Sequence, residues 1–376
     1  MWSPHESGVV VEDAVDDLRW ALARTVDGDL ATRARLQLSL AVELYYDPDH
    51  RAESEALVTS GLALARRSGD PELLWWAARA AWSALWMPAH TERRPDLTAE
   101  GLAAARDVGD RAAEAVLLVG HAVDALELAR REEWESFSAE AERIARRERL
   151  PYVLLTLSWL RMSLAAIGGR EEDAARHHAE LTQTAPLVAV PHQDVQAAAA
   201  LTMSALWAPE RLRSMLAQMR EAQAEHGAGA VLLHSILART GTVDELAEAR
   251  AAMPVEHVPV DYWATLGDWA TEAESAAVLG DRELARRALE VLAPYAGRLV
   301  VTGAVFTMGP VDGYLALVHA TLGDLDAAPR HADAAHDLAV EWEMDAYIRW
   351  LAGHRERLRI QPLPSRSQER GAVLDP

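Results

Sequence analysis

The stretch SGDPELLWWAARAAWSALWM, residues 68–87, decides the fold of this chain. Its tryptophans Trp75, Trp82 and Trp86 are spaced seven and four residues apart, so an α-helix would place them on one face. A glycine and an aspartate precede the proline of this stretch, an order typical of one helix ending and the next beginning. The stretch therefore predicts a tight turn followed by an amphipathic helix with a stripe of indole rings.

The same pattern of two helices and a turn recurs along the chain. The segments GLALARRSGDPE, GLAAARDVGDRA and AERIARRERLPY begin at Gly61, Gly101 and Ala141, forty residues apart. Further Gly-Asp turns follow at residues 280–281 and 323–324, with less regular spacing. A fixed period of about 40 residues built from two helices indicates a helical solenoid.

The later turns resemble the tetratricopeptide repeat. Gly323 and Asp324 occupy the turn, and Ala328 and Ala335 follow at the small-residue positions of that family. In the preceding unit, Trp269 falls at the aromatic position of the family's first helix. Small residues at these positions let two helices approach closely, so the resemblance implies stacked helix pairs.

A longer segment, residues 297–339, carries a more specific resemblance. It contains Gly309-Pro310-Val311 and Tyr314-Leu315, ahead of a Leu-Gly-Asp turn and an Ala-x-x-His helix. This order resembles the C-terminal repeat region of large ATP-binding LuxR-type and SARP-like bacterial transcriptional regulators. We find no Walker motif and no helix-turn-helix segment in the chain, so the resemblance implies a sensory or scaffold part without the ATPase and DNA-binding domains.

These features predict an all-α fold, a right-handed tetratricopeptide-like solenoid of about eight or nine helix pairs. We expect a flexible N-terminal lead over residues 1–10 and a single repeat domain over residues 11–360. The closing sequence QPLPSRSQERGAVLDP, residues 361–376, contains prolines, serines and charges but few apolar residues. It is therefore expected to be a disordered tail.

Composition excludes several classes of function. The 376 residues include no cysteine, and all 37 residues counted as lysine or arginine are arginine. These absences exclude Fe–S clusters, cysteine metal sites, P-loop ATPases and pyridoxal enzymes. A net charge of −21 argues against nucleic acid and anionic membranes as partners. Because no secretory signal or long apolar run is found, we expect a cytoplasmic protein with no cofactor, no metal and no membrane partner.

One helix layer of a solenoid lines the concave surface, which usually binds the partner. If the Gly-Asp turns separate the helices of each pair, the inner layer comprises residues 71–87, 111–129, 151–167, 261–279 and 303–321. In the first half of the chain, the opposite assignment fits the period equally well. The inner layer would carry these candidate ligand-binding residues: Trp75, Trp82, Trp86, Trp159, Arg161, Trp263 and Tyr314. A groove with indole walls suits a small molecule, a peptide or a protein segment.

A structural role is the alternative for these indoles. Stripes of large rings at helical spacing are common in protein cores, and Trp269 matches a structural position of the repeat. However, the chain has 13 tryptophans and 2 phenylalanines, although phenylalanine alone could supply bulk. Because each indole N–H requires a hydrogen-bond partner, we expect some of the tryptophans to lie at the edge of a pocket.

A polar set on one helix is a first candidate for catalysis. His121 and Asp124 lie three residues apart on one helical face, followed by Glu127. This spacing suits a general base with an orienting carboxylate. A solvated helix face explains the same residues, so both interpretations stand.

The prolines of two long turns, residues 184–194 and 253–263, interrupt the repeats. The second turn carries a candidate acid–base set that we expect close together at the mouth of the groove: Glu256, His257, Asp261 and Tyr262. Connectors stiffened by proline are the alternative interpretation. No histidine or carboxylate spacing typical of a metal site occurs, so no metal is predicted.

Two functions from different classes fit these observations. The first is a stand-alone ligand- or protein-binding module of the regulatory or sensor type, using a tryptophan-lined concave groove. The alternative is a metal- and cofactor-independent enzyme of bacterial specialised metabolism, such as a cyclase, isomerase or hydrolase, with an enclosed tryptophan-lined pocket. The sequence leaves open whether the chain forms a homo-oligomer.

Overall fold

The protein is mostly helical, as predicted, with one small two-stranded sheet. Its structure is a computed structural model that describes residues 10–188, 204–208, 211–212, 216, 230–255 and 261–361. The expected lead and tail lie almost entirely outside the described residues. The same holds for the second part of the turn at 184–194 and for Glu256 and His257.

Helices follow one another without interruption by strands between residues 10 and 188. Their bounds are α1 (Glu12–Arg24), α2 (Leu30–Glu43), α3 (Arg51–Ser68), α4 (Pro71–Ala84), α5 (Arg94–Val108), α6 (Arg111–Glu127), α7 (Arg131–Glu148), α8 (Pro151–Ile167) and α9 (Glu171–Thr184). Short 3-10 turns follow α2, α4 and α9 at Leu44–Tyr46, Pro88–His90 and Ala185–Leu187.

The second half contains further helices and a β-hairpin. The bounds are α12 (Ala230–Thr240), α13 (Val243–Ala252), α14 (Thr265–Leu279), α15 (Arg282–Leu292), β1 (Leu299–Thr302), β2 (Phe306–Pro310), α16 (Val311–Leu322), α17 (Ala327–Glu341) and α18 (Asp345–Leu358). A 3-10 turn, Ala293–Tyr295, follows α15.

The hairpin corrects the helix that we expected over residues 303–321. Helix α16 begins only at Val311, because residues 299–310 form two antiparallel strands and their turn. Residues 300–302 are all β-branched, which favours a strand. Gly309 has a φ of +87°, which a right-handed helix does not allow.

The Gly-Asp turns have the geometry that their sequence predicts. Gly69 and Gly109 end α3 and α5 with φ values of +68° and +72°, in the left-handed region that glycine adopts without strain. The following aspartates cap the next helices: Asp70 accepts from the N–H of Glu72 at 2.9 Å, and Asp110 from that of Ala113 at 2.9 Å. One glycine and one aspartate thus end one helix and begin the next.

The period of forty residues reappears as repeated contacts. A Cβ on Gly61 would lie 2.7 Å from Leu38, and one on Gly101 would lie 2.6 Å from Ala78, so both glycines allow a close helix crossing. Ion pairs between alternate helices recur at the same interval: Arg66 with Glu100 at 2.6 Å, Arg106 with Glu140 at 3.1 Å, and Arg146 with Glu180 at 2.6 Å. Helices α3, α5, α7 and α9 therefore form one layer with equivalent contacts.

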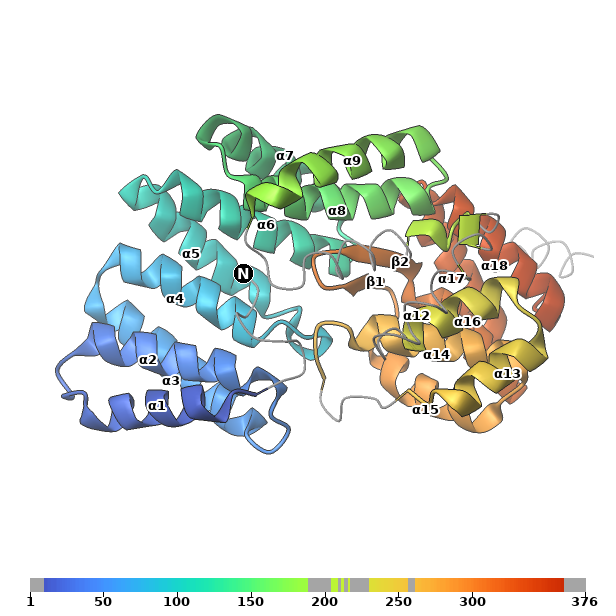
Figure 1. The fold of residues 1–376 in the computed structure, drawn as a ribbon, viewed down its shortest axis with the longest axis horizontal. Coiled ribbons are helices and arrows are strands. Elements are labelled where there is room, and N and C mark those ends of the chain that lie inside the picture. Colours follow the sequence, from blue (N-terminus) through green and yellow to red (C-terminus); the bar gives the residue numbers. More distant parts are fainter. Residues whose placement is uncertain are drawn as a thin grey trace, which may run out of the picture.

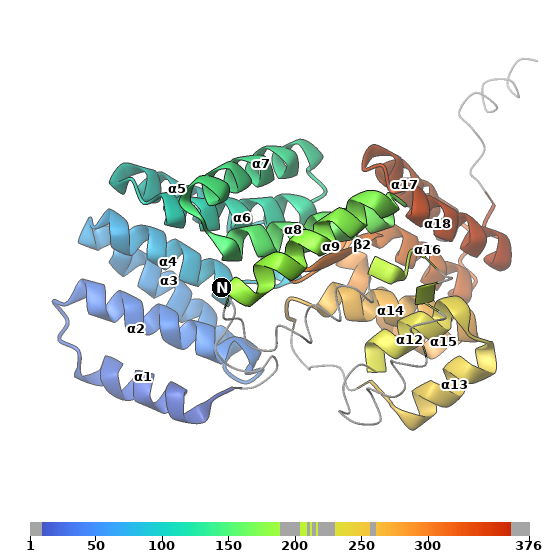
Figure 2. The same ribbon diagram turned by 45° about the horizontal axis from the view of Figure 1, so that its top comes forward.

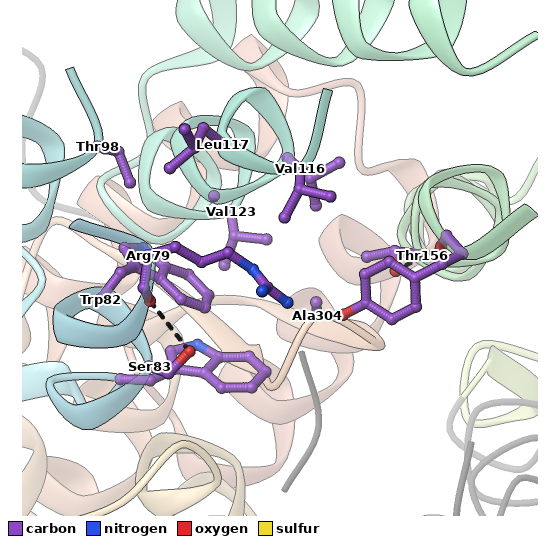
Figure 3. Close-up of a pocket in the computed structure, with 13 residues that line it drawn as sticks. Arg79, Trp82, Ser83, Thr98, Val116, Leu117, Val123, Thr156 and Ala304 are labelled. Atoms are coloured by element: carbon purple, nitrogen blue, oxygen red, sulfur yellow. Dashed lines mark hydrogen bonds between the residues drawn. The ribbon is translucent and has the colours of Figure 1, made fainter. Parts of the chain in front are cut away.

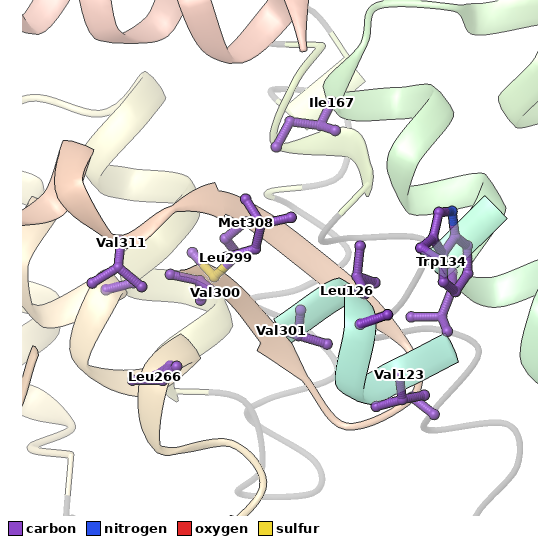
Figure 4. Close-up of a cluster of buried hydrophobic side chains, with 14 of the residues drawn as sticks. Val123, Leu126, Trp134, Ile167, Leu266, Leu299, Val300, Val301, Met308 and Val311 are labelled. Carbon is purple, nitrogen blue, oxygen red and sulfur yellow. The ribbon is translucent and has the colours of Figure 1, made fainter. Parts of the chain in front are cut away.

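The hairpin lies between the two helical halves. Figures 1 and 2 show it between α6 and α8 on one side and the helices from α14 onward on the other. Figure 4 shows the buried side chains that join it to both halves. Val301 and Met308 belong to the same hydrophobic cluster as Leu126 of α6, Ile167 of α8 and Leu266 of α14. The hairpin therefore couples the first half to the second through apolar packing.

None of the helices in the described part of the chain combines the length and the apolar character needed to cross a membrane. The right-handed solenoid and its tetratricopeptide type stay predictions.

Candidate functional site

A cavity lies among α4, α6, α8 and the turn of the hairpin. It holds about 460 Å³ of space, part of which is open to solvent. Each helix contributes residues from one face. Helix α4 presents Arg79, Trp82 and Ser83, at the i, i+3 and i+4 spacing of one helical face, and Trp86 follows two residues after the helix ends. Ala304, in the turn between β1 and β2, completes the wall, so both halves of the protein line this cavity.

Two indoles form the apolar wall. The rings of Trp82 and Trp86 lie 5.0 Å apart between centroids, and each residue is 8% exposed. The ring of Trp86 also lies 6.4 Å, between centroids, from that of Trp263, the last residue of the second long turn. Gly120 of α6 faces Trp82, and a Cβ there would come 3.7 Å from the indole. The cavity thus offers flat aromatic surfaces to an apolar ligand.

Arg79 is the charged member of the wall. Its side chain runs across the cavity toward Ala304 (Figure 3). Within the described part of the chain its guanidinium donates no hydrogen bond and has no carboxylate partner, and its Nε is buried. Burial lowers the pKa of Arg79, and the nearby phenol of Tyr152 partly opposes this shift. Burial also raises the pKa of Tyr152, so this phenol is neutral.

A buried ionic cluster contacts Trp82. Trp82 donates its indole N–H to both carboxylate oxygens of Asp124 at 3.0 Å. Arg94, 0% exposed, pairs through Nε with Asp124 at 3.0 Å and through Nη2 with Glu127. Thr91 donates its hydroxyl to Glu127 at 2.8 Å. These contacts fix the indole ring that forms the cavity wall.

One arginine between two buried carboxylates leaves a surplus negative charge. Burial raises the pKa of Asp124 to about 8; Arg94 opposes this shift, and Glu127 adds to it. The surplus charge therefore favours the protonated form of the Asp124 carboxyl group, while Arg94 remains charged.

The structure does not join His121 and Asp124 as a base and its orienting carboxylate. His121 stacks on Phe137 with ring centroids 4.7 Å apart, and its Nδ1 lies 3.3 Å from the hydroxyl of Thr98. Burial lowers the pKa of His121. Asp124 instead faces Arg94 and Trp82. The three candidates of α6 are all buried, so the alternative of a solvated helix face is wrong for His121, Asp124 and Glu127.

Asp261 joins the two halves rather than the cavity. Its carboxylate accepts from the backbone N–H of Ala89 at 3.0 Å, and its backbone oxygen accepts from Arg51 at 2.8 Å. Burial raises the pKa of Asp261. Its predicted neighbours Glu256 and His257 lie outside the described residues.

The other predicted ligand-binding residues lie away from this cavity. Trp159 is 0% exposed and packs with Leu155 and Val305, and Tyr314 donates its hydroxyl to the backbone oxygen of Met308 at 2.9 Å. Arg161 pairs with Glu142. The remaining two also have structural contacts: Trp75 packs against the main core, and Trp263 donates its indole N–H to Tyr46 at 2.7 Å.

No family model matches this chain, and no curated protein matches it as a relative. The resemblance to LuxR-type and SARP-like regulators therefore stays a prediction. No group of three or more potential metal ligands occurs among the residues that the structure describes. The geometry of the cavity is thus the basis for the functional argument.

The sequence reasoning missed Arg79, Tyr152 and Gly120. Arg79 had a signal, because it lies on the same helical stripe as Trp75, Trp82 and Trp86 and interrupts it with a cation. The sequence contains no such signal for Tyr152 and Gly120, because their place in the cavity wall depends on how α6 and α8 pack against α4.

Proposed function

We propose that this protein is a helical-repeat binding module that takes a small molecule in the cavity between α4, α6 and α8. The observation that carries the proposal is the paired indole wall of Trp82 and Trp86 facing a cavity. The flat indole surfaces suit a compact aromatic ligand that can stack on them.

The position of the cavity favours a small molecule over an extended peptide. Ala304, in the turn of the hairpin, forms part of the wall beside residues of α4, α6 and α8. An occupant would therefore touch the first half and the hairpin together. This double contact supports a sensor role, because a ligand held by both halves stabilises their mutual arrangement.

An enzyme is less well supported than a binding module. None of the candidate acids and bases among the described residues, His121, Asp124 and Asp261, lines the cavity. Asp124 contacts the lining residue Trp82, but its carboxyl group already pairs with Arg94 and accepts the indole N–H of Trp82.

A cavity-filling variant tests the proposal. The probe is 2-naphthamide, a neutral two-ring compound, and its binding is measured by isothermal titration calorimetry on the full chain. We expect Ala304→Phe to weaken binding at least about tenfold, a loss of ~1.4 kcal/mol, because the new ring occupies the cavity. The matched control is Ala296→Phe, at an exposed residue that does not line the cavity.

Absence of binding to the wild-type chain would overturn the proposal. So would equal binding to the wild-type protein and Ala304→Phe, because the probe would then occupy another surface. Circular dichroism of each variant checks that the helices are intact.

A further inference from the structure

Among the described residues, no carboxylate pairs with Arg79, the arginine that lines the cavity. Three other buried or half-buried arginines have carboxylate partners: Arg94 with Asp124, Arg239 with Glu274 at 3.0 Å, and Arg250 with Glu272 at 2.6 Å. Arg79 lacks an equivalent partner within the described residues. Its buried Nε also lacks a hydrogen-bond acceptor there.

An unpaired guanidinium is costly in such a place. Taking a charge out of water is unfavourable unless another charge or a set of hydrogen bonds replaces the lost hydration. Burial lowers the pKa of Arg79 accordingly, yet an arginine stays protonated in proteins because its intrinsic pKa exceeds 12. The charge therefore persists and would attract an anion into the cavity.

The rest of the wall offers nothing that competes for this role. Arg79 is the sole charged residue among the described residues lining the cavity. The hydroxyls of Ser83 and Thr156 donate to backbone oxygens of their own helices at 3.2 and 3.1 Å. Because no lining carboxylate repels an anion, the guanidinium decides the charge preference.

We infer that the cavity binds an aromatic carboxylate, with the carboxylate on the guanidinium of Arg79 and the ring against Trp82 and Trp86. A guanidinium and a carboxylate can form two parallel hydrogen bonds, which fixes the orientation of the ligand as well as its charge. This inference rests on the proposed function and assigns the ligand class of the same cavity.

A matched pair of probes separates the two claims. 2-Naphthoate and 2-naphthamide share the ring system and differ in charge at one substituent. We expect the wild-type chain to bind the naphthoate about ten- to a hundredfold more tightly, as a charge-assisted bidentate contact allows. Calorimetry on the full chain measures both affinities, and the naphthoate should also raise the melting temperature more than the amide does.

Substitution of the arginine tests the assignment directly. In Arg79→Gln, we expect the naphthoate affinity to fall to that of the amide while the amide affinity stays within about twofold. Arg79→Lys should keep part of the preference because it keeps the charge. The control Arg67→Gln changes an exposed arginine of α3 outside the cavity and should behave like the wild-type chain.

Each outcome decides between the claims. One outcome is that the amide binds, that Ala304→Phe abolishes its binding, and that the wild-type chain binds the naphthoate no more tightly than the amide. In that case the proposed function survives and the carboxylate inference is wrong. If Arg79→Gln keeps the full preference for naphthoate, another group selects the anion and the inference is again wrong. If neither probe binds the wild-type chain, both the proposed function and the inference fail.

Discussion

Two buried carboxylates of this protein differ in the balance of charge around them. Asp124 and Glu127 share Arg94, and burial raises the pKa of Asp124 to about 8. Glu274 has Arg239 to itself and also accepts from the indole of Trp350 at 2.7 Å, and its pKa is lowered to about 2 despite its burial. One site therefore favours a protonated carboxyl group, and the other favours an ionised one.

The shift at Asp124 predicts a pH dependence of stability. An unfolded aspartate has a pKa near 3.8, so between about pH 4 and pH 8 the folded state binds more protons than the unfolded state. The free energy of unfolding should therefore contain a contribution that falls as the pH rises through this range. In Asp124→Asn this contribution is absent, and the decline with pH should be shallower.

Urea unfolding at pH 5, 7 and 9 measures the effect. The control is Asp107→Asn, at an exposed residue of α5. Its free energy of unfolding should change with pH as that of the wild-type protein does. Equal slopes for Asp124→Asn and the wild-type protein would show that Asp124 does not bind the extra proton.

The shift at Glu274 has the opposite sign. Its lowered folded pKa contributes stability that is present above the unfolded value near 4.5 and is lost as the pH falls toward 2. Glu274→Gln leaves Arg239 buried without its counter-charge, and we expect a loss of about 3 kcal/mol at pH 7. Urea unfolding should show this difference shrinking below about pH 4, as the wild-type carboxylate is protonated. A constant difference at all pH values would point to lost packing instead.

At the scale of elements, close helix crossings set the repeat. Gly101 of α5 stands where a Cβ would meet Ala78 of α4 at 2.6 Å, whereas Gly353, inside α18, has no atom within 4 Å of an added Cβ. Glycine within a helix costs stability because the unfolded chain has more conformational freedom there. At Gly101 this cost is offset by the close packing of α5 against α4, which a larger residue would prevent.

Alanine at these two positions should change the free energy of unfolding in opposite directions. Gly101→Ala forces α4 and α5 apart and should cost about 1–3 kcal/mol, as overpacking does. Gly353→Ala should add about 0.5–1 kcal/mol, because it only removes the helix penalty of glycine. The free energies of unfolding in urea compare the two variants. A stabilising Gly101→Ala would mean that the crossing is looser than the structure has it.

Much of the element structure was predictable because its causes are local. Gly69-Asp70 and Gly109-Asp110 specify a helix end and the next helix cap within a few residues, and these turns have the predicted geometry. The hairpin at residues 299–310 was missed, although its β-branched run was visible, because the helical repeats around it suggested another helix. The partners of Asp124 and the isolation of Arg79 depend on contacts between elements far apart in sequence, so spacing alone could not predict them.

At the scale of the whole molecule, the hairpin is both a structural link and a wall of the cavity. Its strands pack on α6, α8 and α14, and its turn supplies Ala304 to the cavity. A ligand against Trp82 and Trp86 would thus stabilise the first half and the hairpin of the second half together. A binding event could reach the second half through this path, which is what a sensor requires.

Hydrogen exchange on the full chain can follow that coupling. We expect 2-naphthoate to slow amide exchange in α4 and α6 and also in residues 299–310, because opening of the hairpin would expose the bound ligand. Helix α13, which does not line the cavity, should exchange at the same rate with and without the probe and serves as the internal control. The variant Ala304→Phe should show no response. Slowing confined to α4 and α6 would describe a ligand bound by the first half alone, and the sensor role would then lose its physical basis, because the hairpin would not register that the cavity is occupied.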